Sequence, residues 1–354
     1  MQKPSLPILI LLSALLSAVL LPACVAGNKA YDAGMDQARA GNHQAALASF
    51  DQVLAQAGDP AKNPVYVPAL LARAESLKAL DRPREALEDY RKASELAPGD
   101  LRPWIGMARL EEDLFLFDSA AAHFGRAAGL AVALPPAEDK GAEATGPDPV
   151  GLYMAQALNL SRTASHAQAA RAYAEASALE PGYAWAQAGR AVSLALSGRC
   201  DQALEPFDRF LELMPGDRDG LLGRGLCRME AKRYEGALAD FEALLAAPGV
   251  DQDPDRGEYL FQRARALAGL DRAGEAVAGF AQVIALDPER AETVRNECLS
   301  PKALAKALKQ AQDLAMNPKG GKGKADALLP VMECFSGLAL GKDMPGCRQV
   351  LNGL

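Results

Sequence analysis

The stretch from Trp185 to Asp217 reads WAQAGRAVSLALSGRCDQALEPFDRFLELMPGD, and its spacing of small and aromatic residues recurs along most of the chain. Ala203 is followed four residues later by Phe207, and this Ala-x-x-x-aromatic pair occurs seven times. The pairs are Ala46/Phe50, Ala86/Tyr90, Ala120/Phe124, Ala169/Tyr173, Ala203/Phe207, Ala237/Phe241 and Ala276/Phe280. The steps between neighbouring alanines are 40, 34, 49, 34, 34 and 39 residues. A period of this length predicts a stacked array of helical units.

Each period predicts two antiparallel helices joined by a short turn. Two helices approach closely only where their side chains are small, so we expect Ala191 on the first helix to face Ala203 on the second. Phe207 lies one helical turn beyond Ala203 and would fill the space toward the next unit. Gly198 can end the first helix in a left-handed conformation, and Pro215 stops the second. One pair leaves apolar surface uncovered, so neighbouring pairs must stack on it.

The pattern resembles the tetratricopeptide repeat (TPR) family over roughly residues 28 to 289. The family's small position in the first helix is occupied by Gly34, Ala74, Ala108, Ala157, Ala191, Gly225 and Ala264, and its terminal proline by Pro98, Pro181, Pro215 and Pro288. The resemblance implies an all-α solenoid of about seven TPR units, with units 1 to 3 in residues 28–132 and units 4 to 7 in residues 150–289. Arginines stand where the family more often has leucine, and we expect their stems to pack with the guanidinium groups outside. These arginines are Arg73, Arg190, Arg224 and Arg263.

The N-terminal residues 1–24 are typical of an export signal. A basic Lys3 precedes a long apolar run that ends at Leu21-Pro22-Ala23-Cys24. This tetrapeptide resembles the lipobox of bacterial lipoproteins, which implies lipid attachment at Cys24 and a membrane lipoprotein facing the periplasm. Two other interpretations stay open: simple cleavage near Ala26 or Gly27 and release as a soluble periplasmic protein, or an uncleaved membrane anchor.

Residues 133–149 interrupt the period with a segment rich in Pro, Gly and acidic residues. Such a composition predicts a solvated loop, which is either a flexible spacer or a hinge between a three-unit half and a four-unit half. After Pro288 the period fails, and residues 290–354 predict a helical extension. Its stretch KALAKALKQAQDLA, with Leu304 and Leu308 on one face, would cap the last repeat or lie on a membrane surface.

The cysteines carry information because export places them in an oxidising compartment. Cys200 begins the second helix of one unit and Cys227 lies late in the first helix of the next, so we predict that they form a disulfide. Cys334 and Cys347 flank a Gly/Pro turn and are a second candidate pair, with Cys298 left over.

Catalytic and metal sites have little support in the sequence. His43 and His166 occupy one repeat position that elsewhere holds Phe117, Cys200 or Tyr234, as expected for a packing slot. No Cys-x-x-Cys pair, His-Glu-x-x-His helix or Gly-x-Ser-x-Gly turn occurs. The net charge of −7 and the lack of a basic stripe with interleaved aromatics argue against nucleic-acid binding. We predict that the protein is not an enzyme and that it binds no cofactor, no metal ion and no small-molecule substrate.

The resemblance implies instead that the first helices line a concave groove for a protein or peptide partner. The groove positions expected from the repeat are Leu158, Arg162, Trp185, Val192, Leu196, Leu222, Leu226, Met229, Gln262 and Arg265. An apolar centre with a polar rim would suit an amphipathic helix or an apolar peptide. The alternative is that several of these side chains pack between helices. The sequence therefore predicts a membrane-tethered periplasmic scaffold, or alternatively an accessory subunit of a cell-envelope enzyme, polysaccharide or secretion system whose function lies in the C-terminal tail.

Overall fold

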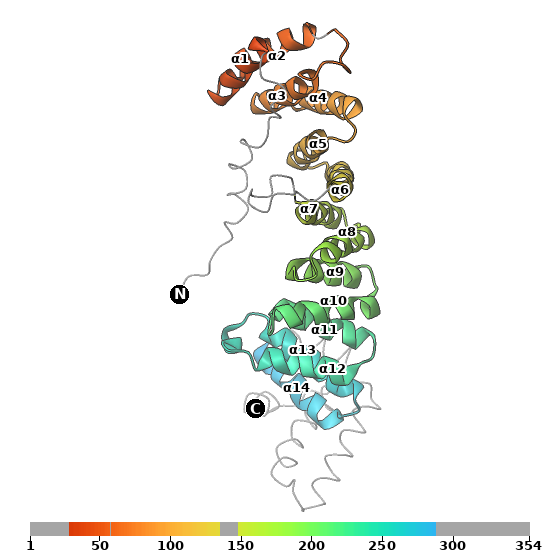
Figure 1. Cartoon of the computed structure of the whole chain (residues 1–354). Coiled ribbons are helices and arrows are strands. Elements are labelled where there is room, and N and C mark those ends of the chain that lie inside the picture. Colours follow the sequence, from red (N-terminus) through yellow and green to blue (C-terminus); the bar gives the residue numbers. More distant parts are fainter. Residues whose placement is uncertain (1–27, 57, 135–147, 288–354) are drawn as a thin grey trace, which may run out of the picture. The chain divides into compact units, whose positions relative to one another are not determined.

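The computed structural model describes residues 28–56, 58–134 and 148–287, and in these ranges the protein consists of α-helices with one short 3-10 helix and no strand (Figure 1). The helices follow one another in antiparallel pairs, as the repeat predicts. The chain divides into two compact units, one ending at Glu180 and the other beginning at Pro181. The all-α repeat fold expected from the sequence is confirmed.

The first unit holds four helix pairs. They are α1 (Lys29–Arg39) with α2 (His43–Ala55), α3 (Tyr66–Ala79) with α4 (Pro83–Leu96), α5 (Leu101–Asp113) with α6 (Phe117–Ala133), and α7 (Pro149–Arg162) with α8 (His166–Leu179). Each helix packs on the next one along the chain. This includes α6 and α7, which lie side by side although residues 135–147 between them fall outside the described part. The spacer and hinge interpretations of that loop therefore stay predictions.

The second unit holds three pairs and one insertion. The pairs are α9 (Ala184–Leu196) with α10 (Cys200–Leu213), α11 (Arg218–Glu230) with α12 (Tyr234–Leu245), and α13 (Arg256–Gly269) with α14 (Ala273–Leu286). The insertion after α12 contains the 3-10 helix η1 (Val250–Gln252), whose Val250 is buried and which packs against α13. The predicted C-terminal extension, residues 290–354, lies outside the described residues.

The Ala and aromatic residues of the repeat form the core, as predicted. The seven alanines of the pairs are 0 to 1% exposed and the seven aromatic side chains 0 to 5%. A Cβ atom added to Gly225 on α11 would lie 2.7 Å from Phe241 of the same helix pair, and one added to Gly223 would lie 2.5 Å from Phe207 of the preceding pair. The ring of Phe241 therefore packs against the first helix of its own pair and that of Phe207 against the first helix of the next pair, and only small residues fit opposite them.

Candidate partner-binding surface

Helix α9 carries a row of exposed apolar side chains. Trp185, Val192 and Leu196 are spaced seven and four residues apart, which places them on one face of the helix. They are 56%, 47% and 62% exposed, respectively. The only charged residue of α9 is Arg190, and it pairs with Glu205 of α10 at 3.2 Å. The outer face of α9 is therefore apolar and uncharged.

Helix α11 continues this surface. Leu226 stands 34 residues after Val192, so the two side chains are at the same repeat position of neighbouring first helices, and α9 contacts α11 within the second unit. Leu226 is 39% exposed, whereas Leu222 and Met229 are half-buried and pack against the core of the unit. We call Trp185, Val192, Leu196 and Leu226 the apolar face. Leu222 and Met229 combine the two predicted roles, because each packs between helices and keeps part of its surface accessible.

The two predicted rim residues of α13 differ from each other. Arg265 is exposed, and its guanidinium lies 5.8 Å from the ring centre of Phe261. Gln262 is buried, at 6% exposure. Its amide nitrogen donates to Glu258 at 2.7 Å and its oxygen accepts from Arg265 at 3.1 Å. The expectation that Gln262 lies at the accessible edge of the groove is therefore corrected: this side chain links neighbouring turns of α13 and offers no free surface.

In the first unit, Leu158 of α7 is 50% exposed and occupies the repeat position of Val192 and Leu226. Arg162 is already engaged, since its Nη1 donates to Glu112 Oε1 at 2.6 Å and its guanidinium lies 5.0 Å from the ring centre of Phe117. Arg162 therefore stabilises the contact between α5 and α7, and a partner would have to compete for it. Leu158 belongs to the first compact unit, whereas the apolar face belongs to the second.

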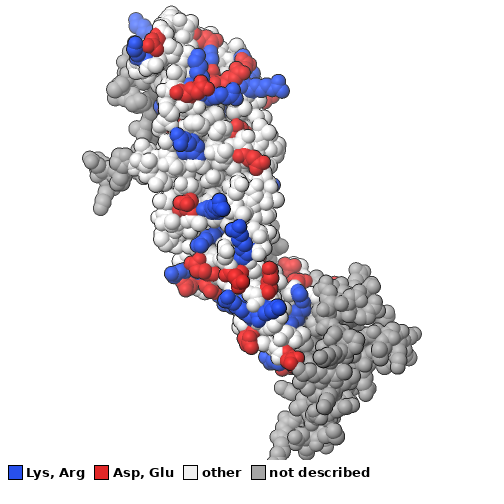
Figure 2. Space-filling view, turned by 90° about the vertical axis from the view of Figure 1, so that its right-hand side faces the viewer, with Lys and Arg blue, Asp and Glu red and all other residues white. Residues whose placement is uncertain are grey.

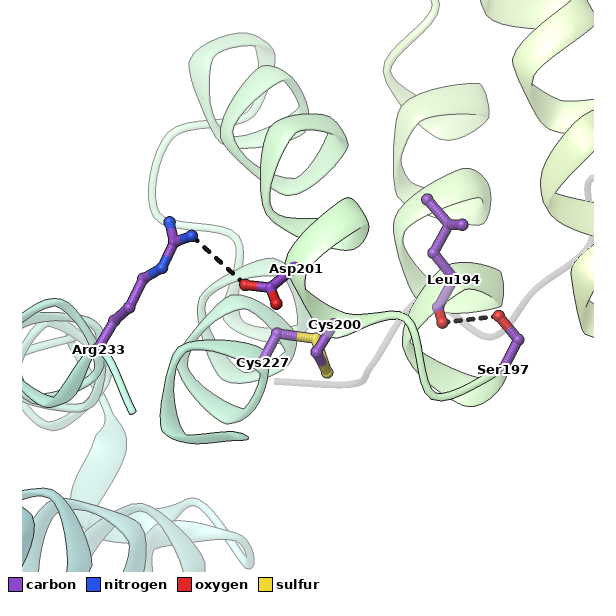
Figure 3. Close-up of a disulfide and its surroundings, with 6 residues drawn as sticks. All are labelled: Leu194, Ser197, Cys200, Asp201, Cys227 and Arg233. Atoms are coloured by element: carbon purple, nitrogen blue, oxygen red, sulfur yellow. Dashed lines mark hydrogen bonds and ion pairs between the residues drawn. A yellow bond between two sulfur atoms is a disulfide. The ribbon is translucent and has the colours of Figure 1, made fainter. Parts of the chain in front are cut away.

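The predicted disulfide between Cys200 and Cys227 is present, with a Cα–Cα distance of 4.7 Å (Figure 3). Both side chains are buried, Cys200 at the first residue of α10 and Cys227 late in α11. The bond joins two helix pairs, and in Figure 3 it lies beside the ion pair of Asp201 and Arg233, which are 3.4 Å apart. It holds α11, which carries Leu226, in place against the pair that carries Trp185 and Val192. The other candidate cysteines, Cys24, Cys298, Cys334 and Cys347, lie outside the described residues.

A ladder of Arg–Asp pairs runs along the helix pairs, and sequence reasoning missed it. Arg224 of α11 donates to Asp240 of its own pair at 2.6 Å and to Asp208 of the preceding pair at 2.7 Å. Arg228 adds a second bond to Asp240 at 2.8 Å. In the first unit, Arg73 bridges Asp89 at 2.6 Å and Asp51 at 2.5 Å. The expectation that these guanidinium groups lie outside is therefore wrong for Arg73 and Arg224, because nearly buried aspartates hold them between helices.

The Arg–Asp ladder shifts the pKa of an arginine and leaves a regular spacing in the sequence. The hydrogen bonds that Arg73 donates to Asp89 and Asp51 raise the pKa of Arg73 above its ordinary value, against the opposing effect of burial. The signal is a separation of 16 residues in both Arg73/Asp89 and Arg224/Asp240. On the face drawn in Figure 2, basic and acidic side chains lie next to each other in mixed groups, and uncharged surface separates one group from the next. Charge on this face is therefore largely compensated locally.

The histidines lie in packed surroundings. His43 and His166 are half-buried at the start of α2 and α8, in the slot that Cys200 fills in its own pair. His123 Nδ1 lies 2.6 Å from Glu111 Oε2, and its ring centre is 5.7 Å from that of Trp104. Within the described ranges there is no group of three or more His, Cys, Asp or Glu side chains placed to hold a metal ion. In the same ranges no helix is both long and apolar enough to cross a membrane.

The paired helices, the Ala-aromatic packing and the repeat period together define an all-α protein with the tetratricopeptide-repeat fold. No family model matches the sequence. Among solved structures, Naa15/Naa10 bound to HypK-THB is similar with a TM-score of 0.55 and 16% identity, over 92% of this chain and 48% of that chain. YrrB, described as a TPR protein with an unusual peptide-binding site, gives a TM-score of 0.42 and 19% identity over 60% of this chain and 95% of that chain. A tetratricopeptide repeat protein from Parabacteroides merdae ATCC 43184 gives a TM-score of 0.39 and 14% identity, over 86% of this chain and 98% of that chain.

Proposed function

We propose that this protein is a non-enzymatic scaffold that binds a protein or peptide partner on the apolar face of α9 and α11. The observation that carries the proposal is the row of accessible apolar side chains at Trp185, Val192, Leu196 and Leu226. Scattered single apolar residues are common on protein surfaces, but a contiguous row on adjacent helices is typical of a binding site. An amphipathic helix or an apolar peptide laid along this row would cover it. The similar fold of Naa15/Naa10, which is bound to HypK-THB, agrees with a role in protein binding.

The binding surface is tested by placing charge on it. We expect Val192→Asp combined with Leu226→Asp to abolish capture of the partner in crosslinking and affinity purification from membranes, because burying two carboxylates in an apolar contact is unfavourable. Both side chains are partly exposed, so helicity measured by circular dichroism should not change. The matched control is Leu213→Asp with Met214→Asp, two residues that are each 41% exposed at the end of α10 and off the apolar face. Retained capture in the first variant would exclude the apolar face as the binding site.

The dependence on salt gives a second test of the same surface. Electrostatic contacts between exposed charges weaken strongly with ionic strength, whereas apolar burial does not. Since α9 presents only apolar side chains on this face, we expect the partner to remain bound when the salt concentration is raised from about 0.1 M to 1 M, where the screening length falls from about 10 to 3 Å. Release of the partner in that range would point to charged residues elsewhere.

We further propose that the scaffold is tethered to a membrane facing the periplasm by lipid on Cys24. Support comes from the apolar run and the Leu21-Pro22-Ala23-Cys24 sequence. Two or more acyl chains hold a protein durably on a bilayer. The substitution Cys24→Ser should abolish incorporation of labelled fatty acid and remove the protein from the detergent-soluble lipoprotein fraction. Continued labelling of the Cys24→Ser protein would refute the tether.

A further inference from the structure

A second surface lies in the first unit, at the turn between α5 and α6. All the described turns between the two helices of a pair share one backbone conformation, in which the first helix ends with a residue of positive φ. In this turn Phe115 has φ +60°, its N–H donates to Glu112 O at 3.0 Å, and the N–H of Leu116 donates to Glu111 O at 2.8 Å. This is the Schellman motif, in which the left-handed position is usually filled by glycine.

The residues of this turn differ from those of the other described pairs. At the left-handed position the others have Gly41, Asp81, Ala164, Gly198, Lys232 and Asp271. The next position holds Asn42, Arg82, Ser165, Arg199, Arg233 and Arg272. Only the α5–α6 turn, among those described, places a large aromatic side chain and then a leucine there. A bulky residue at positive φ is strained, so Phe115 opposes the local backbone preference.

Packing within the unit does not account for Phe115. Its side chain is 78% exposed, and its neighbours Leu116 and Leu114 are 50% and 38% exposed. The ring of Phe115 contacts that of Phe117 edge-on, with the ring centres 5.9 Å apart. Three consecutive apolar residues therefore expose a large part of their side-chain surface to solvent at this turn. A strained residue with an exposed apolar side chain is typical of a contact site.

Carboxylates flank this apolar tip on both sides. Asp113 precedes it, is 64% exposed, and has Lys78 Nζ at 3.7 Å. Asp118 follows it, is exposed, and has no cation within 4 Å among the described residues. Glu112 is bonded to Arg162 at 2.6 Å. Lys78 and Arg162 compensate two of these carboxylates, so the border of the apolar tip keeps a net negative charge at Asp118. We call this border acidic.

We propose that Leu114 to Leu116, with Phe117 supporting them, insert into an apolar socket of a partner protein whose rim carries Lys or Arg. The acidic border decides between the occupants. A second copy of this chain would bring the same carboxylates toward Asp113 and Asp118, and the two borders would repel each other. An anionic lipid surface would repel them as well. A basic rim pairs with them and also guides the approach of the partner.

This surface is separate from the proposed apolar face. It lies in the first unit, on a turn between α5 and α6, whereas the apolar face is formed by α9 and α11 of the second unit. The two proposals can therefore fail independently. The combination Val192→Asp with Leu226→Asp should leave contacts of the Phe115 turn unchanged.

The test is photo-crosslinking of the full-length protein in its native cells, with p-benzoyl-phenylalanine in place of Phe115. We expect adducts with one protein at apolar residues that have Lys or Arg nearby in its structure. Adding excess protein without the photo-reactive residue should lower the adduct yield several-fold, whereas adding Phe115→Gly protein should not. Asp113→Asn with Asp118→Asn should lower the adduct yield several-fold at low salt. The matched control carries the same photo-reactive residue at Ala164, the left-handed position of the next pair, and should give no such adduct.

The outcomes that overturn the proposal are distinct. Adducts only with lipid would identify the turn as a membrane contact, and adducts only with a second copy of this chain would identify it as a dimer contact. If no adduct can be competed away, the turn binds no partner. A stability measurement separates function from structure. Phe115→Gly should raise the melting temperature by ~2 °C, because glycine tolerates positive φ. A lower melting temperature would show that Phe115 stabilises the fold, and the argument from strain would fail.

Discussion

At the scale of single residues, Asp240 connects more of the second unit than its sequence position suggests. Its carboxylate is 3% exposed and bonds to both Arg224 and Arg228. Replacing it with alanine would remove the buried carboxylate from two poorly solvated guanidinium groups and leave them to share Asp208, which is 48% exposed. Such a half-broken cluster is more unfavourable than the absence of the whole cluster. The aspartates of the ladder therefore fix how neighbouring helices meet, and the arginines depend on them.

We predict that Asp240→Ala lowers the free energy of unfolding by about 3 kcal/mol, as measured by urea denaturation. The matched control is Glu212→Ala, which removes an exposed pair with Arg209 whose side chains are 62% and 63% exposed. That change should alter stability by less than about 0.5 kcal/mol. Equal losses in the two variants would mean that the ladder contributes no more than an ordinary surface pair.

Gly225 provides a second prediction at this scale, based on space rather than charge. A Cβ atom at Gly225 would lie 2.7 Å from Phe241 Cε1 and 3.3 Å from Asp240 Cβ, so Gly225→Ala must displace the ring or the helix. We expect a loss of ~1 to 3 kcal/mol. Gly129 of α6 has no atom within 4 Å of such a Cβ, and Gly129→Ala should instead gain about 0.5 to 1 kcal/mol through helix propensity. Thermal unfolding that shows the same sign for both would contradict this account of the core.

At the scale of helices, the disulfide is the element that joins two pairs covalently. It closes a loop of 27 residues between the start of α10 and the end of α11. In the chain-entropy treatment a loop of this length stabilises the folded protein by about 3.5 kcal/mol. We therefore expect Cys200→Ala with Cys227→Ala to unfold at lower denaturant concentration than the oxidised protein. Reducing agent should have the same effect on the wild-type protein and none on the variant; unchanged unfolding would show that the bond is not formed in solution.

The helices also show what the sequence could and could not predict. The positions of Ala203 and Phe207 recur in all seven helix pairs, at steps of 34 residues or of 34 residues plus an insertion. The same requirement for close packing acts in every pair, so the fold followed from the spacing. No packing requirement common to all pairs fixes the charged positions. Arg224 was expected outside because an arginine is usually solvated, and only the aspartate 16 residues later reveals that a buried carboxylate holds it. Gln262 was placed at the rim by repeat position alone, which says nothing about its bonds to Glu258 and Arg265. The exposure of Phe115 could not be predicted, because the period does not show which turn residues face solvent.

At the scale of the whole molecule, a repeat array should respond locally to a local change. Helices of the described chain pack mainly on their neighbours in sequence, and stability in such an array is close to a sum of terms for units and their interfaces. A compact protein with one core would instead transmit a loss of stability throughout. The two equivalent aspartates, Asp89 in α4 and Asp240 in α12, allow the two behaviours to be compared in one protein.

We predict that Asp240→Ala accelerates amide hydrogen exchange in α11 to α13 and leaves α1 to α4 unchanged, because α12 packs on α11 and α13 and not on the early helices. Asp89→Ala should accelerate exchange in α3 to α5 and leave α12 to α14 unchanged, since Asp89 bonds to Arg73 of its own pair. The two changes share no partner, so their effects on stability should add within ~0.5 kcal/mol in the double variant. Faster exchange along the entire chain in either single variant would show that all the repeats unfold together, and the stability of the array could then not be assigned to its separate helix pairs.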